Sequence, residues 1–306
     1  MSTTSTRFGF RKLTARIGAE VTGHNPALEL DAEAVAELRS ALNEHKALLF
    51  RDVSIDDDGQ QRFARYFGEL TRAHPTVPAV PGQPSILPVD SEESRANHWH
   101  TDVTFVVNPP QVSTLRSIVI PPYGGETLIA NTAAAYRDLP APLRGLADTL
   151  QAVHTNDYDY AVPPEILNEV ERERRALFVS TKYESVHPVV RVHPLTREHG
   201  LYIGGFAQRI IGLSAGESKD ILRLLQAYVA RPENVLRVSW QPGQLVLFDN
   251  RITQHYAIDN YDDLPRRLNR VTVAGDIPVG VDGKQSYSLK GDSSHYSPVA
   301  EVPVAA

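Results

Sequence analysis

Cysteine is absent from this sequence of 306 residues. Its absence excludes disulfide bridges, thiolate-bound zinc, iron–sulfur clusters and cysteine nucleophiles. Any metal site must therefore use histidine, aspartate or glutamate as ligands. The chain has 11 histidines and 37 acidic residues, so such ligands are available.

Long apolar segments are also absent. No apolar run reaches the ~18 residues that a membrane-spanning helix needs, so we expect no membrane span. The sequence begins MSTTSTRFGFRKL, which is polar and basic and contains no apolar stretch. We therefore expect no secretory signal and a cytoplasmic protein.

The chain lacks a surplus of positive charge. It has 31 lysines and arginines against 37 acidic residues, which gives a formal net charge of −6. An acidic chain of this kind is not expected to bind nucleic acid or anionic membranes. Net charge is an average over the whole chain, however, and it leaves room for a small basic pocket that binds an anionic substrate.

The organisation of the chain predicts a single domain over residues 1–306. No internal repeat and no linker-like stretch divides it, and its length suffices for one large buried core. The sequence also lacks the GxGxxG, GxxxxGK[ST] and GxSxG motifs. Dinucleotide-binding, P-loop and hydrolase-elbow sites are therefore not supported.

Four segments have the pattern of helices. Asp31 is placed as the N-cap of the first, and Ser214 with Glu217 forms a capping box at the last. The last segment carries a predicted buried stripe of Ile221, Leu224, Leu225 and Tyr228. The four predicted helices cover residues 32–47, 58–70, 165–177 and 214–230.

Many short β-like runs lie between these helices, and proline and glycine separate them at short intervals. Few neighbouring runs are bridged by a helix, so repeated βαβ units are not expected. This pattern favours a mainly β protein, either a sandwich or a jelly roll, with helices packed outside. The predicted strands cover residues 47–50, 112–120, 127–130, 189–192, 235–240, 244–248 and 268–273.

A first candidate for chemistry is the pair His100 and Asp102. If this stretch is a strand, side chains two residues apart point to the same face and can converge. One imidazole and one carboxylate make up two of the three ligands of a facial triad. A single HxD pair is common by chance, so the motif needs a third ligand from elsewhere in the chain.

His255 follows an apolar strand and a polar turn late in the chain, and Arg266 and Arg270 come after it. Residues four apart in a strand share one face, so both guanidinium groups can reach one pocket. An arginine inside a β-barrel needs an internal carboxylate or a bound anion, because an unpaired buried charge is costly. By themselves, the two arginines fit a pair of surface side chains on an edge strand better than they fit a pocket.

Together these residues form a recognisable motif. An HxD pair, a distant histidine and an arginine about ten residues beyond it resemble the iron(II)- and 2-oxoglutarate-dependent dioxygenases. The chain is similar to the branch that contains taurine dioxygenase and the alkylsulfatase-type enzymes, from Arg16 to Asp276. The most specific stretches are Trp99–Phe105, Gly124–Thr127, Ala130–Tyr136 and Asp249–Arg251 leading to His255.

The resemblance implies a double-stranded β-helix, or jelly-roll, core and an enzyme that uses Fe(II), 2-oxoglutarate and O2. It implies that His100, Asp102 and His255 are the iron ligands and the catalytic centre. It also implies that Arg266 binds the far carboxylate of 2-oxoglutarate, assisted by the Thr127 hydroxyl.

The same resemblance implies a site for the anionic head of the substrate. Arg270, His74 and the backbone N–H of Val103 match the donors of that site. Phe206 is a candidate for the apolar wall and Asn97 for a polar contact. His74 also fits an ordinary loop histidine, and an aromatic residue such as Phe206 is often plain core.

The segments around residues 94–99, 154–160 and 187–194 look more like the alkylsulfatase type than the taurine type. The resemblance therefore favours oxidative cleavage of an alkyl sulfate ester to an aldehyde and sulfate, with succinate and CO2 as co-products. The alternatives are a taurine or alkanesulfonate dioxygenase that releases sulfite and, more distantly, an aryloxyalkanoate dioxygenase. A non-catalytic metal-binding module of the cupin type is a third alternative.

Residues 157–187 are rich in charge, tyrosine and proline, which suits a lid over the site or an ordinary surface excursion. The family resemblance also implies a homo-oligomer, either a dimer or a tetramer. The C-terminal tail beyond Pro278 carries no pattern that assigns it a role.

Overall fold

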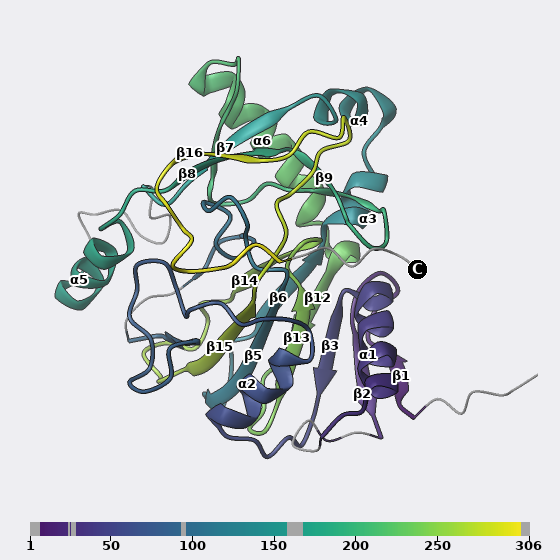
Figure 1. The fold of residues 1–306 in the computed structure, drawn as a ribbon, viewed down its shortest axis with the longest axis vertical. Coiled ribbons are helices and arrows are strands. Elements are labelled where there is room, and N and C mark those ends of the chain that lie inside the picture. The colour runs from purple at the N-terminus through teal and green to yellow at the C-terminus, as the bar shows by residue number, and fades with distance from the viewer. Residues whose placement is uncertain (1–6, 24, 26–28, 93–95, 158–167, 301–306) are drawn as a thin grey trace, which may run out of the picture.

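The computed structural model describes residues 7–23, 25, 29–92, 96–157 and 168–300. A seven-stranded sheet, in the order β1-β2-β3-β13-β5-β15-β4, forms the larger half of the core (Figure 1). Its strands are β1 (Gly9–Lys12), β2 (Ala19–Thr22), β3 (Ala47–Phe50), β13 (Leu245–Asp249), β5 (Val112–Val119), β15 (Arg267–Val273) and β4 (Ile86–Asp90).

Smaller sheets make up the rest of the β structure. A three-stranded sheet has the order β12-β6-β14, a four-stranded sheet β11-β7-β8-β16, and two strands pair as β10-β9. These strands are β6 (Thr127–Asn131), β7 (Gln151–Thr155), β8 (Glu184–Pro188), β9 (Val190–Val192), β10 (His199–Leu201), β11 (Ala207–Ile210), β12 (Val235–Val238), β14 (Thr253–Ala257) and β16 (Tyr287–Lys290).

Within the described residues, six helices pack outside the sheets, as predicted. In Figure 1, α2 lies at the lower edge of the seven-stranded sheet, whereas α4 and α6 lie at the opposite end. The helices are α1 (Ala32–His45), α2 (Asp57–Arg65), α3 (Thr132–Arg137), α4 (Ala141–Ala147), α5 (Glu169–Phe178) and α6 (Ala215–Val229), and a short 3-10 turn covers Pro232–Asn234. None of the helices in the described ranges is long and apolar enough to cross a membrane.

The central strands of the larger sheet are buried on both faces, which explains their continuous apolar sequences. Leu245 and Leu247 of β13 point to the cluster under α1 and α2. Val246 and Phe248 point the other way, into a second cluster with Ile129 of the three-stranded sheet. The two sheets therefore face each other across a shared apolar layer. This confirms the predicted mainly β fold with a jelly-roll core.

The predicted helix caps are confirmed, whereas the end of one helix and one buried position of another differ from the prediction. Asp31 caps α1, and Ser214 and Glu217 form the predicted capping box of α6. The second helix ends at Arg65 rather than at residue 70, because the next amides close i→i+3 turns up to Gly68, whose φ of 148° no helix allows. The predicted stripe of α6 is wrong at one position, because Leu224 is 42% exposed.

The predicted lid at residues 157–187 falls partly outside the described residues, which omit 158–167. Within the described part, α5 begins at the Asn168 cap, and the Asn168–Glu171 capping box is complete. Residues from Glu184 onward belong to β8, which pairs with β7 inside a sheet. Movement of this segment stays a prediction.

The two neighbouring leucines of α6 provide a test of the packing. Leu225 is 2% exposed and belongs to an apolar cluster, whereas Leu224 faces outward. We expect Leu225→Ala to lower the free energy of unfolding by about 2–5 kcal/mol because it leaves a cavity. Leu224→Ala, with the same change in helix propensity, should stay within about 0.5 kcal/mol. Urea denaturation of both variants measures this difference, and equal losses would contradict the observed orientation of α6.

Candidate active site

Two histidines from distant parts of the chain are joined by backbone pairing. His255 lies on β14, and His100 pairs with it in an isolated antiparallel bridge. The His100 N–H donates to the His255 carbonyl (3.0 Å), and the His255 N–H donates to the His100 carbonyl (2.8 Å). Their ring centres are consequently only 4.1 Å apart.

Asp102 completes this cluster, although the predicted strand geometry is wrong. Only His100 is bridged to another strand, and Asp102 begins a turn. The turn still brings the Asp102 Oδ1 atom to 3.7 Å from His255 Nε2. One donor atom from each of His100, Asp102 and His255 lies within 4.8 Å of the others, and all three residues are buried.

The side chain of Asn250 holds the backbone of Asp102 from both sides. Its Oδ1 accepts a hydrogen bond from the Asp102 N–H (2.9 Å), and its Nδ2 donates to the Asp102 carbonyl (3.2 Å). Nδ2 also donates to the Pro110 carbonyl (2.8 Å). The Ser113 hydroxyl donates to the Asp102 carboxylate (2.7 Å). These contacts fix the direction in which the carboxylate points.

The protonation states suit a metal site. Burial alone would raise the pKa of Asp102, but the charges of Arg270, His255 and His100 bring it down to about 2. Burial lowers the pKa of His255 to about 3, with a contribution from the charge of His100. Burial also lowers the pKa of His100. The cluster therefore presents one carboxylate and two neutral imidazoles at neutral pH.

The tautomer of His100 follows from its contacts. Its Nδ1 lies 2.9 Å from the His98 carbonyl, which can only accept a hydrogen bond. The proton is therefore on Nδ1, and the lone pair of Nε2 is available to a metal.

Arg266 is buried next to Thr127, as predicted, and within the described residues it forms no ion pair. Its Nε donates to the Gly125 carbonyl (2.7 Å) and its Nη2 to the Thr127 hydroxyl (3.2 Å). The indole N–H of Trp240 donates to the same hydroxyl (2.9 Å). Gly125 has a φ of 68°, and a Cβ there would lie 2.9 Å from Arg266 Cδ. Glycine is thus required for the arginine to lie here.

Arg270 differs from Arg266 because it has an internal carboxylate. Its Nη1 donates to Asp102 Oδ1. Its Nε and Nη2 are buried and make no hydrogen bond within the described part of the chain. Arg270 therefore stabilises the Asp102 carboxylate with one nitrogen and leaves two nitrogens, Nε and Nη2, as donors for another group.

His74 has a defined tautomer. Its Nδ1 accepts hydrogen bonds from the N–H groups of Thr76 (3.2 Å) and Val77 (3.1 Å). Burial lowers its pKa well below the usual value, and the nearby charges of Arg270 and Arg174 lower it further. The ring is therefore neutral at pH 7 and carries its proton on Nε2, which is left as a donor.

Val103 has a strained backbone. Its φ is 56°, a left-handed conformation that a β-branched residue rarely adopts. Among the described residues, no acceptor takes a hydrogen bond from its N–H. Strain of this kind is typical of functional turns.

An aromatic wall lies beside these donors. Phe105 and Phe206 contact each other edge to face, with ring centres 5.0 Å apart, and Phe206 lies 6.1 Å from the His100 ring. Phe178 at the end of α5 joins them and lies 5.3 Å from the His74 ring. Phe178 and Asn250 were not predicted as site residues, because helix periodicity and a short polar turn do not show what each side chain contacts.

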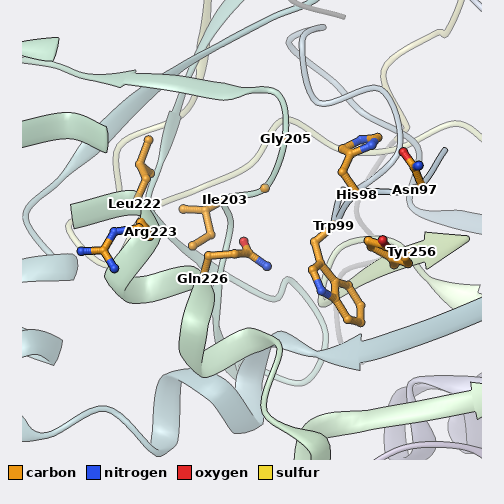
Figure 2. A pocket seen from close by; sticks show the side chains of 10 residues that line it. Asn97, His98, Trp99, Ile203, Gly205, Leu222, Arg223, Gln226 and Tyr256 are labelled. Atoms are coloured by element: carbon orange, nitrogen blue, oxygen red, sulfur yellow. The ribbon is translucent and has the colours of Figure 1, made fainter. Parts of the chain in front are cut away.

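Asn97 lines a different hollow, a groove between α6 and the segment before His100. Figure 2 shows Leu222, Arg223 and Gln226 of α6 on one side and Trp99, His98 and Tyr256 on the other. His100, Asp102 and His255 do not line this groove. The predicted contact of Asn97 with substrate stays a prediction.

Comparison with known proteins identifies the family. The family model described as "Taurine catabolism dioxygenase TauD, TfdA family" matches residues 9–272. The chain belongs to this family. It is similar to an alpha-ketoglutarate-dependent sulfate ester dioxygenase of Pseudomonas putida (49% identity over 281 residues, 91% of this chain and 93% of the relative).

Two further TauD, TfdA family relatives cover almost the whole chain. An alkylsulfatase of Acinetobacter baylyi is 47% identical over 93% of this chain and 89% of its own length. The crystal structure of a taurine dioxygenase from Burkholderia xenovorans has a TM-score of 0.80 and 38% identity, and it covers 94% of this chain and 96% of its own. The alternative of a non-catalytic module is therefore wrong, and the chain is a dioxygenase.

Enzymes of the TauD, TfdA family use Fe(II), 2-oxoglutarate and O2, and the chemistry of this site fits them. Neutral imidazoles and a carboxylate are suitable ligands for Fe(II), and three ligands leave positions open for other molecules. The buried Arg266 has no carboxylate partner in the described chain, so an anion such as 2-oxoglutarate matches its charge.

The Asn250 contacts give a testable consequence for metal binding. We expect Asn250→Ala to weaken the binding of Fe(II) or Co(II) about 10–100-fold, because Asp102 loses its backbone support. Calorimetric titration of the apoprotein under argon measures this affinity. Asn234→Ala is the matched control, because Asn234 is equally buried but bonds to Tyr228 and Arg16 away from the site. Equal metal affinities in both variants would contradict the positioning role.

Proposed function

We propose that this dioxygenase cleaves alkyl sulfate esters to an aldehyde and sulfate. The observation that carries this is the pair of buried arginines, only one of which has an internal carboxylate. Arg266 and the free N–H groups of Arg270 mark places for two separate anions. The identities of 49% and 47% to a sulfate ester dioxygenase and an alkylsulfatase support the choice of a sulfate ester.

In this proposal His100, Asp102 and His255 hold Fe(II), and Arg266 with Thr127 holds the far carboxylate of 2-oxoglutarate. Iron in this setting supplies the activation of O2, with 2-oxoglutarate oxidised to succinate and CO2. The chain itself orients the reactants: Asn250 and Ser113 hold Asp102, and the aromatic wall keeps water away from the reacting carbon.

The sulfo head of the substrate is assigned to Arg270, the Nε2–H of His74 and the N–H of Val103. A sulfo group has three terminal oxygens, and these donors lie on different segments around it. Phe206 and Phe105 line the apolar side, where the carbon chain is expected. One oxygen atom inserted into the C–H bond beside the ester oxygen gives an unstable adduct. Its C–O bond then breaks to release the aldehyde and hydrogen sulfate.

We also propose a dimer or tetramer in the cytoplasm. The cytoplasmic location is supported by the cosubstrate, because 2-oxoglutarate is a metabolite of the cell interior. The oligomer is an analogy with relatives. Analytical ultracentrifugation of the purified protein decides the state, and a monomer would contradict the proposal.

A substrate screen tests the function. With Fe(II), ascorbate and 2-oxoglutarate, hexyl sulfate is expected to stimulate succinate formation and to yield equimolar sulfate, and a chelator should abolish both. Taurine tests the sulfonate alternative through sulfite, and an aryloxyalkanoate tests a carboxylate head. If none of these stimulated succinate formation, the sulfate-ester proposal would be wrong.

The two arginines should separate in kinetics. Arg266→Ala is expected to raise the KM for 2-oxoglutarate by ~30-fold or more, because a charge-assisted hydrogen bond is worth about 2 kcal/mol. Arg270→Ala should raise the KM for hexyl sulfate instead. Iron binding is measured in both variants, because Arg270 also contacts Asp102. Reversed effects would show that the two anion sites are exchanged.

A further inference from the structure

The sequence assigned no role to the C-terminal tail. In the structure this tail folds back over the hydrogen-bond donors of the proposed sulfo site. The Arg72 N–H donates to the Tyr296 carbonyl (2.9 Å), which ties the tail to the segment that carries His74. Asn108 Nδ2 donates to the carbonyls of Ser297 (3.0 Å) and Pro298 (3.1 Å). The tail thus joins the His74 segment to the chain that follows the Val103 turn.

These bonds bury Tyr296 between the two segments. Tyr296 is 1% exposed and packs in one apolar cluster with Val103, Phe105 and Phe206. Residues 71–72 link it to β15, because the Thr71 N–H donates to the Thr272 carbonyl (3.0 Å) next to the Arg72–Tyr296 bond. Thr272 shares a face of β15 with Arg270, two residues before it. The charges of Arg270 and Asp102 both act on its hydroxyl. The phenol therefore packs in the same cluster as Val103, one of the proposed sulfo donors.

The Tyr296 hydroxyl lies close to the hydroxyls of Thr71 and Thr272, but within the described residues it is in hydrogen-bond geometry with no partner. The nearby hydroxyls of Thr71 and Thr272 are 2.5 Å apart and bond to each other. Burial raises the pKa of Tyr296, so the phenol keeps its proton and can donate.

Three buried donors thus have no hydrogen-bond partner among the described residues: Tyr296 Oη, Arg270 Nε and Arg270 Nη2. Buried N–H and O–H groups almost always have partners, and each lost hydrogen bond costs about 1–3 kcal/mol. A group of such donors beside an arginine matches an anion with several oxygens.

We propose that the Tyr296 hydroxyl is a further donor to the anionic head of the substrate, together with Arg270, His74 and the Val103 N–H. This inference rests on the proposed function and deepens it. A sulfo head offers three terminal oxygens, whereas a carboxylate head offers two. The tyrosine therefore favours a sulfo head over a carboxylate of equal chain length.

The test is Tyr296→Phe, which removes only the hydroxyl. The holoenzyme variant is expected to show an about tenfold higher KM and Kd for hexyl sulfate, as one lost hydrogen bond predicts, with an unchanged KM for 2-oxoglutarate. Kd is measured by calorimetry with Fe(II) and 2-oxoglutarate under argon. Its affinity for heptanoate, which has the smaller head, should change less.

Tyr183→Phe is the matched control. Tyr183 belongs to the same apolar cluster and is 2% exposed, but the charge that acts on it is Asp292 rather than Arg270. We expect its hexyl sulfate KM and Kd to equal those of the wild type. Tyr296→Met, which also lacks the hydroxyl, replaces Tyr296→Phe if that variant does not fold.

The outcomes separate the two proposals. A lower melting temperature of Tyr296→Phe with unchanged KM and Kd would mean that the hydroxyl only supports the fold, and the inference would be wrong. If the wild type ignored hexyl sulfate but used taurine or a carboxylate, the proposed substrate would be wrong. The KM and Kd of Tyr296→Phe and Tyr183→Phe for that anion would then decide whether the Tyr296 hydroxyl is a donor to the head of the substrate.

Discussion

The buried carboxylate of Asp102 is the group on which the rest of the site depends. A charge away from water is costly unless paired and hydrogen-bonded. Here Ser113 from β5 and Arg270 from β15 bind the carboxylate, and Asn250, directly after the adjacent strand β13, holds the Asp102 backbone. The order β13-β5-β15 therefore explains how a carboxylate on an irregular turn is held ionised beside two histidines.

The same sheet also separates the two proposed anion sites. Arg270 points into the site and shares its charge with Asp102, whereas Arg266, just before β15, reaches Gly125 and Thr127 of the opposing segment. Arg266 and Arg270 lie only four positions apart in the chain, yet they have different partners. Arg266 needs an external anion to balance its charge, whereas the charge of Arg270 is already paired with Asp102. This asymmetry gives an acidic protein two local positive sites of different strength.

Prediction from the sequence succeeded where the signal is local. The capping residues of α1 and α6 and the continuous apolar strand β13 follow from short patterns, and the structure confirms them. It failed where neighbours in space decide. Leu224 has the right spacing for a buried stripe but is 42% exposed, and the turn at Asp102 replaces a predicted strand.

By itself the sequence determined the chemistry that was possible: without cysteine, any metal ligands had to be histidine and carboxylate, and the family motif pointed to three candidates, which the structure brings together. Only the tertiary structure decided which arginine pairs with Asp102, that Asn250 holds its backbone, and that the tail buries Tyr296 beside Arg270. The physical reason is that burial and hydrogen-bond partners are set by residues distant in sequence. Composition and spacing reveal which donors exist, but not which ones remain free.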